Sequence, residues 1–282
     1  MFRPGISQPG TDAEGDQPRP VEDAPRPTAA ERVRTLVESS VSAMLTIPGI
    51  ETGAGVPGAG SPEVRAVTPD GDVILLVPAD SPAAQAAAYA QDDDLTAVME
   101  ITDVAPVAVP HRIRGRAWVA GWLTAVRNEQ RAECARLLGE ANPSGMPAGT
   151  AWLMLRLEVG EAFVDDLWGP EHVEPDEFAD AAPDPLVRHE AELLQHLASA
   201  HGEQVRGLCA CRETERVVPL ALDRYGLRVR FCESDGDGEG EPGGRGERGE
   251  RCMDARFEFP RTVESVAELR HAMHALFTAS GS

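Results

Sequence analysis

Hydrophobic positions along the chain predict an alternation of amphipathic helices and short strands. From Thr28, the stretch TAAERVRTLVESSVSAML places an apolar residue every three to four positions, as a helix does, and Glu31 completes a capping box with Thr28. Short apolar runs then predict strands in MLTIPGI, EVRAVTP and DVILLVP. The segment Pro69-Asp70-Gly71 joins the last two strands as a hairpin turn.

The β-rich pattern continues to residue 168. It predicts an alanine-rich helix over 81–91, strands over 95–103 and 109–125, a helix over 127–140, and a final pair of strands in AWLMLRLEV and EAFVDDLW. Residues 1–28 are rich in Pro, Gly and acidic side chains and predict a disordered tail. The β domain therefore covers residues 29–168, and the acidic segment 169–185 is expected to be an exposed linker.

The last hundred residues have a different pattern. They predict a helix over 186–201, strands over 205–212, 215–222, 226–232 and 253–259, and a closing helix over 263–278. Residues 233–251 hold no apolar side chain and predict a disordered loop. The expected fold class is α+β, with a β domain followed by a small α-β-β-β-β-α domain over 186–282.

Charge and composition exclude several classes of function. The formal net charge is −21 and every basic residue is arginine, so a Schiff-base lysine and a phosphate-loop lysine are both excluded. The acidic balance predicts no nucleic-acid binding. The N-terminus has no apolar core of signal-peptide type and no run reaches the length of a membrane span, which predicts a cytoplasmic protein.

Three weak motifs favour structural interpretations. Gly53, Gly55 and Gly58 have dinucleotide-loop spacing but precede prolines and a strand, which indicates a connection. The run ESDGDGEGE lacks the last calcium ligand of an EF-hand loop. The cysteines are odd in number and lack framework spacing, which speaks against a disulfide-stapled domain; they are residues 134, 209, 211, 232 and 252. Cys209 and Cys211 fall in an expected strand and point to one face, so buried free thiols explain these cysteines better than a zinc site shared with Cys232 and Cys252.

Arginines alternate in HRIRGRAW, and in a strand Arg112, Arg114 and Arg116 project to one face. A solvated outer face explains this pattern. The alternative is a cationic patch that binds a carboxylate- or phosphate-bearing ligand, for which the planar guanidinium is well suited.

Histidines on the two long helices of the last domain are the best candidates for chemistry. His201 falls near the middle of the apolar stripe of helix 186–201, and His196 lies to one side. In the closing helix His274 flanks the buried face, whereas His271 points away and is expected at the surface. Core or capping histidines explain each of them singly, while two helix-borne histidines in one small domain favour a shared ligand such as haem iron. No catalytic triad signature is found.

The second domain resembles a known family. The pattern HLASAH (His196 to His201) and the terminal segment ARFEFPRTVESVAELRHAMHALF are similar to a C-terminal domain found behind split β-barrels in HugZ-type haem oxygenases and in the chloroplast glutamyl-tRNA-reductase-binding protein. The same domain occurs alone in small haem-binding regulators. The first domain resembles, in layout, the FMN-binding-type split barrel of the pyridoxamine-phosphate-oxidase superfamily.

The resemblance implies a haem-binding protein of HugZ-like type, in haem or iron handling, that dimerises through its barrels. On this hypothesis the helix-borne histidines His201 (or His196) and His274 are the candidate iron ligands, and Arg114 or Arg116 pairs with the haem propionates. This chain departs from the family at Ala198 and Ala200, where relatives carry Asn and Asp, and at its end, since HugZ-type oxygenases take a haem ligand from a C-terminal extension. Haem binding is therefore implied more strongly than a haem oxygenase-like activity.

Two other functions stay open on the same resemblance. One is a non-enzymatic adaptor that contacts an enzyme of tetrapyrrole synthesis, which the acidic surface and disordered segments also fit. The other is an oxidoreductase that binds FMN in the barrel.

Overall fold

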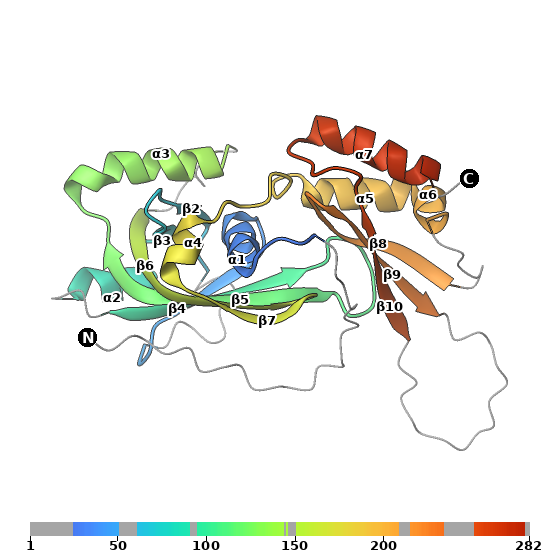
Figure 1. Cartoon of the computed structure of the whole chain (residues 1–282). Helices are drawn as coiled ribbons and strands as arrows, with labels where there is room; N and C mark the ends of the chain where they lie inside the picture. The colour runs from blue at the N-terminus through green and yellow to red at the C-terminus, as the bar shows by residue number, and fades with distance from the viewer. Residues whose placement is uncertain are drawn as a thin grey trace, which may run out of the picture. The chain divides into compact units, whose positions relative to one another are not determined.

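The computed structural model of the protein describes residues 25–50, 61–90, 95–143, 145, 151–208, 215–233 and 251–279 (Figure 1). Several expected features lie outside the described residues: most of the tail 1–28, Gly53, Gly55 and Gly58, Cys209 and Cys211, and loop positions 234–250. The chain forms two compact units. The N-terminal unit holds Thr28–Asp103 and Gly115–Pro183, and the C-terminal unit holds Val104–Arg114 and the residues from Asp184 onward.

The N-terminal unit is a curled antiparallel sheet with helices (Figure 1). Its sheet runs in the order β1-β4-β5-β6-β3-β2, with β7 paired to β6. The strands are β1 (Ala43–Thr46), β2 (Val64–Val67), β3 (Val73–Pro78), β4 (Thr96–Val104), β5 (Ile113–Ala125), β6 (Trp152–Asp166) and β7 (Gly169–Val173). The helices are α1 (Ala29–Glu38), α2 (Pro82–Tyr89), α3 (Arg131–Ala141) and α4 (Pro175–Asp180).

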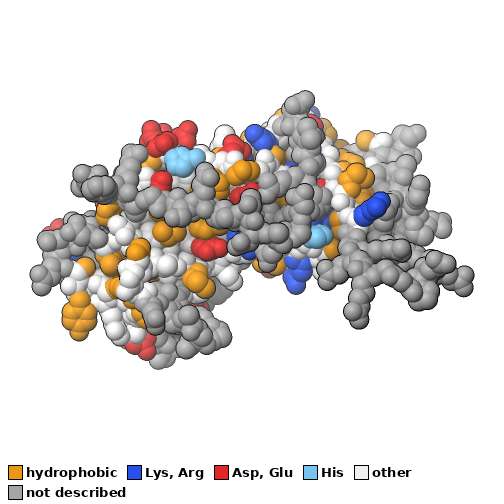
Figure 2. Space-filling model, turned by 90° about the horizontal axis from the view of Figure 1, so that it is seen from below, with side chains coloured by type: hydrophobic (Ala, Val, Ile, Leu, Met, Phe, Trp, Pro, Cys, Tyr) orange, Lys and Arg blue, Asp and Glu red, His pale blue; other side chains and the backbone are white. Residues whose placement is uncertain are grey.

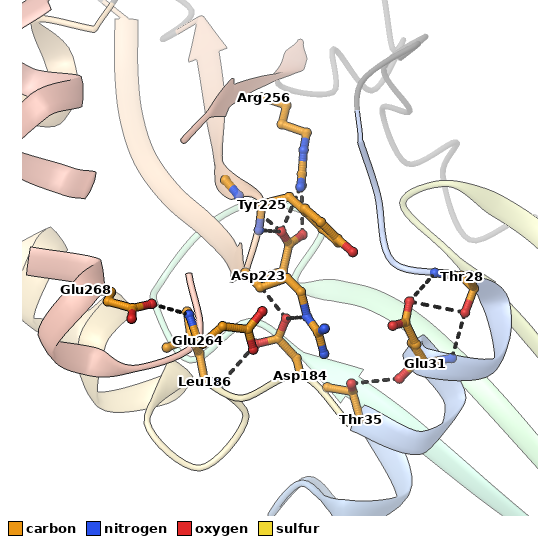
Figure 3. Close-up of polar contacts among 12 residues, drawn as sticks. Thr28, Glu31, Thr35, Asp184, Leu186, Asp223, Tyr225, Arg256, Glu264 and Glu268 are labelled. Carbon is orange, nitrogen blue, oxygen red and sulfur yellow. Dashed lines mark hydrogen bonds and ion pairs between the residues drawn. The ribbon is translucent and has the colours of Figure 1, made fainter. Parts of the chain in front are cut away.

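Local sequence signals set several of these elements as predicted. Thr28 and Glu31 form the expected capping box of α1, drawn in Figure 3. The Pro69-Asp70-Gly71 turn is confirmed, with Gly71 at a φ of 89°, where a Cβ atom costs steric energy. α2 begins after the side-chain cap Ser81.

Strand β3 is buried on both faces, which explains its continuous apolar sequence VILLVP. Val73, Leu75 and Val77 lie in the main core with α1. Ile74 and Leu76 face the opposite way, into a second cluster that α3 completes. Because both faces need apolar side chains, this strand lacks the polar alternation of a strand that faces solvent.

One long strand, β6, replaces the two expected from AWLMLRLEV and EAFVDDLW. Its 15 residues continue through Gly160, where the register with β5 shifts between Ala120 and Gly121. A Cβ atom at Gly160 would lie 2.9 Å from the ring of Trp122. Gly160 is therefore a bulge residue within one strand and not a turn between two.

The acidic segment 169–185, expected as a linker, is ordered as β7 and α4. Val173 and Phe178 are fully buried in the main core. These two apolar residues anchor the segment, while Glu174, Asp176, Glu177 and Asp180 are exposed, so acidic composition alone gave the wrong expectation. Figure 2 shows acidic side chains in several separate groups among the hydrophobic and uncharged ones, in keeping with the net charge of −21.

Arg65 of β2 is a buried cation that binds the end of α1. Its guanidinium donates to the carbonyl oxygens of Val37 at 3.0 Å, and of Ser39 and Val41 at 2.8 Å each. Burial lowers the pKa of Arg65 to about 10. The arginine satisfies carbonyl groups that a helix end leaves without intrahelical donors, and its charge complements the negative end of the helix dipole.

The C-terminal unit is a three-stranded sheet with helices along one side (Figure 1). The sheet order is β10-β9-β8. Its elements are α5 (Glu190–Ala200), α6 (Gly202–Arg206), β8 (Glu215–Asp223), β9 (Gly226–Glu233), β10 (Cys252–Glu258) and α7 (Val266–Ala279). The expectation of a strand over 205–212 is wrong for the part of that range that the structure describes, since Val205 and Arg206 belong to α6. No helix in the described ranges is long and apolar enough to cross a bilayer.

The two faces of the small sheet differ in chemistry. On β9, Leu227, Val229 and Phe231 alternate with Arg228, Arg230 and Cys232, and all six are buried. Cross-strand partners share a face. We call the polar side the arginine face; it carries Arg216, Arg228, Arg230, Cys232, Cys252, Asp254 and Arg256.

A disulfide joins Cys232 of β9 to Cys252 of β10. The expectation of free thiols is wrong for these two residues, because the β9–β10 register places them directly opposite each other although they are 20 positions apart in sequence. Cys134 of α3 is free and buried.

Asp184 fixes the entry to the C-terminal unit. Its carboxylate accepts from the backbone NH groups of Leu186 and Arg224, both at 2.8 Å (Figure 3). Burial raises the pKa of Asp184 to about 6, against the lowering effect of these two hydrogen bonds; Asp223 raises it further and Arg224 lowers it.

We predict that replacing Arg65 by Met lowers the free energy of unfolding of the N-terminal unit by about 3–5 kcal/mol, since buried carbonyl groups lose a charged donor. All four tryptophans (118, 122, 152 and 168) belong to this unit, so urea unfolding followed by tryptophan emission reports on it. The matched control is Arg136→Met, which removes an exposed i,i+4 ion pair and is expected to cost less than about 0.5 kcal/mol. Equal losses would contradict the role of Arg65.

We also predict a pH dependence from Asp184. Between pH 4 and 6 the folded state keeps this proton while the unfolded state loses it, so the group's contribution to stability falls as the pH rises. The difference in unfolding free energy between wild type and Asp184→Asn should fall by roughly 2–3 kcal/mol across this window. Urea unfolding followed by circular dichroism measures it, with exposed Glu203→Gln as control. A difference that is constant or rises with pH would refute the raised pKa.

Candidate functional site

Three aromatic rings meet where α5 and α6 join, against α7. The ring centroids of His196 and His201 lie 5.0 Å apart in an edge-on arrangement, and the His201 ring stacks on Phe277 with centroids 6.4 Å apart. We call His196, His201 and Phe277 the ring cluster. His201 ends α5 and starts α6, so its backbone leaves the helix and its ring is half-buried. The structure thus brings His196 and His201 together.

Hydrogen bonding indicates the tautomer of His201. Its Nδ1 contacts Oε1 of Gln204. An amide oxygen only accepts, so Nδ1 carries the proton and, in the neutral ring, Nε2 keeps a lone pair. A histidine held in this way is suited to bind a metal through Nε2.

His274 is exposed on α7, one turn before Phe277. Residues three apart on a helix lie on neighbouring positions of its surface, so His274 borders the side of α7 that carries Phe277. Its backbone carbonyl accepts from Thr278.

A pocket of about 650 Å³ lies beside α7, wholly within the C-terminal unit. Val263, Ala272 and Ala275 supply apolar surface. Its remaining lining residues are Pro260, Arg261, Thr262, Glu264, Glu268 and His271. The volume falls in the range of about 300–1,000 Å³ that is usual for small-molecule sites.

His271 is the candidate that sequence reasoning missed. It is exposed, as expected, but it lines this pocket, whereas His274 is not among the lining residues. Its Nδ1 lies 3.0 Å from the carbonyl oxygen of Ala267, which fixes the proton on Nδ1 and leaves Nε2 as the basic nitrogen. Residues 260–264 ahead of α7 line the same pocket, and only the fold shows that they and His271 share it.

In the N-terminal unit, His172 of β7 lies between two glutamates. Its ring nitrogens are 3.6 Å from Glu161 and 3.7 Å from Glu174. No group of three or more His, Cys, Asp or Glu in the part of the chain that the structure describes is arranged to hold a metal ion.

The three arginines of HRIRGRAW do not act as one stripe. Arg112 precedes β5 and donates to the carbonyl of Ala105 at 3.1 Å. Arg114 is buried in the C-terminal unit, where it makes a two-bond ion pair with Glu190 at 2.6 and 3.0 Å and donates to the carbonyl of Leu220. Arg116 belongs to the N-terminal unit and lies opposite Asp165 of β6.

Arg114 has a structural role within the chain. Its guanidinium holds the segment 104–114 to α5 and β8, and Glu190 extends the connection by accepting from the backbone NH of Leu222 at 3.1 Å. These bonds are internal, so Arg114 positions the segment 104–114.

Comparison with known proteins shows the fold. No family model and no curated protein sequence matches this chain. Among solved structures, the chain is similar to a haem-binding protein from Mycobacterium smegmatis, at 21% identity and a TM-score of 0.56, covering 91% of this chain and 99% of that one. It also aligns with a protein of unknown function from Agrobacterium tumefaciens, at 14% identity and a TM-score of 0.36, over 91% and 100% of the two chains. The first comparison shows a shared fold.

We predict that Arg114→Met lowers the free energy of unfolding of the C-terminal unit by about 3 kcal/mol, because Glu190 is left without its partner. A double-mutant cycle with Glu190→Gln should give a coupling energy of about 1–3 kcal/mol in urea unfolding followed by circular dichroism. The control is Arg112→Met, which removes an exposed arginine from the same segment. A loss no larger than that of the control would show that Arg114 does not hold the segment.

Proposed function

We propose that this protein binds haem in its C-terminal unit. The observation that carries the proposal is a pocket of about 650 Å³ lined by His271, whose Nδ1 donates to the carbonyl of Ala267 and whose Nε2 therefore keeps its lone pair. The fold it shares with the haem-binding protein of Mycobacterium smegmatis supports the same ligand class.

The residues around the pocket suit a porphyrin. His271 offers a neutral imidazole nitrogen, the usual protein ligand of haem iron. The apolar side chains of Val263, Ala272 and Ala275 suit the flat hydrocarbon surface, and the Arg261 guanidinium suits a propionate. Haem, when bound, supplies the redox and oxygen chemistry, while the chain supplies an axial nitrogen and positioning.

The ring cluster is the other place for the iron. His201 also presents Nε2, and His196 lies beside it. His274, the third histidine that helix periodicity indicates as a ligand, lies on α7 between His271 of the pocket and Phe277 of the ring cluster. We favour the pocket because it combines a histidine with room for a ligand.

Hemin titration of single variants tests the proposal. We predict a saturable Soret shift for wild type and at least a tenfold loss of affinity, about 1.4 kcal/mol, for His271→Ala. The matched control is His274→Ala, an exposed histidine on the same helix that does not line the pocket, which should bind as wild type does. Circular dichroism checks that each variant is folded.

Other results would contradict the proposal in distinct ways. A loss confined to His201→Ala or His196→Ala would move the iron to the ring cluster. If wild type shows no Soret shift, the proposal of haem binding is wrong. Flavin bands in the purified protein would then favour an oxidoreductase that binds FMN in the N-terminal unit. A colourless protein would favour the non-enzymatic adaptor. If hemin binds, loss of the Soret band with ascorbate in air tests the finer proposal of haem degradation.

A further inference from the structure

The Cys232–Cys252 disulfide lies in a polar setting that structural disulfides of a core do not have. Both cysteines belong to the arginine face of the small sheet, at one row of the β8-β9-β10 ladder. In that row Arg216 of β8 is the register partner of Cys232, which is in turn the partner of Cys252. A cation therefore lies across from one sulfur and on the same face.

The two sulfurs differ in access. Cys232 is on the central strand and is fully buried, while Cys252 is on the edge strand β10 and is partly exposed. An external thiolate therefore reaches Sγ of Cys252 first, and Sγ of Cys232 is the leaving group. A lower pKa of the leaving thiol speeds such an exchange.

Positive charge on the arginine face favours the leaving thiolate. Arg216 donates to the backbone carbonyl of Ala108 at 2.7 Å. Because a carbonyl group is neutral, this hydrogen bond does not neutralise the charge of the Arg216 guanidinium. Arg230, two residues from Cys232 on the same face, is matched by Asp254 through bonds of 2.6 and 2.8 Å, so that pair adds little net charge. Arg216 is thus the cation that lowers the cost of a Cys232 thiolate.

We propose that Cys232 and Cys252 form a redox-active site that exchanges with dithiols in the folded protein. A dithiol thiolate attacks Sγ of Cys252, the Cys232–Cys252 bond breaks, and Cys232 leaves as a thiolate. The second thiol of the reductant, as thiolate, then attacks the mixed disulfide, closes its own disulfide and releases Cys252. Both cysteine thiolates take up protons, so two electrons pass from the dithiol to the protein.

Reduction also changes how the segment 104–114 is held. Asp254 of β10 positions Arg230, whose Nη1 donates to the carbonyls of Pro110 at 2.9 Å and His111 at 2.7 Å. The disulfide fastens β10 to β9 two residues from Asp254. Opening it frees the end of an edge strand, so Asp254 holds Arg230 less firmly and the backbone at 110–111 loses rigidity.

The test is reduction of the full-length native protein by the small dithiol dithiothreitol, with alkylation and peptide mass mapping of each cysteine. We expect Cys232 and Cys252 to become labelled without denaturant, and Arg216→Gln to slow their reduction about tenfold. The matched control is Arg251→Gln, which removes an arginine next to Cys252 that lies outside the arginine face and should leave the rate unchanged. Labelling that requires denaturant, or equal rates for the two variants, would overturn the proposal.

Amide hydrogen exchange tests whether reduction of the disulfide loosens the segment 104–114. We expect amide exchange in 104–114 to rise several-fold on reduction, and Cys252→Ser, which removes the bond but keeps the buried Cys232, to reproduce the rise without reductant. The matched background is Cys134→Ala, which removes the free thiol of α3 and should change nothing in this segment. Unchanged exchange in the reduced protein and in Cys252→Ser would overturn the coupling.

Discussion

The Arg230 guanidinium, fully buried in the small sheet, is the group on which the C-terminal unit depends. It is held by both oxygens of Asp254 and itself holds two backbone carbonyls of the segment 104–114. A buried charge of this kind is tolerated only when its donors are engaged, so the strands, the acid and the segment must be in place together. Arg114, with Glu190 and Leu220, makes the second such connection to the same segment.

Arginine performs in this chain the structural tasks that a lysine would perform poorly. Its planar fork allows Arg65 to bind three carbonyls at the end of α1, and Arg230 to bind a carboxylate and two carbonyls at once. An ammonium group has three donors and no fork. The chain contains no lysine, so its cations are of the one type that suits buried multidentate contacts. Arg65, Arg114 and Arg230 thus have structural roles, whereas Arg261 lines the pocket.

Local signals predicted the elements that local interactions determine. The capping box at Thr28, the turn at Gly71 and the doubly buried strand β3 depend on neighbours in sequence or on the apolar count of one strand. The segment 169–185 was misjudged because its two anchors, Val173 and Phe178, are outnumbered by acids that face outward. The Cys232–Cys252 pair could not be predicted, since it depends on the register of two strands far apart in sequence. The burial of Arg114 could not be predicted either, because its partners Glu190 and Leu220 are far away in sequence. Its alternation with Arg112 and Arg116 is also the pattern of a solvated strand face.

The histidines show the limit of helix periodicity. Periodicity placed His201 in the apolar stripe of its helix, but α5 ends at Ala200 and the His201 ring is only half-buried. Periodicity placed His271 at the surface, where it is, but could not show that this position lines a pocket together with residues of the chain ahead of α7. A crystal structure of the protein grown with hemin tests the account most directly. It should show iron bound to Nε2 of His271, with the porphyrin along Val263, Ala272 and Ala275. Iron bound to His201 or His196, or haem elsewhere in the molecule, would contradict it.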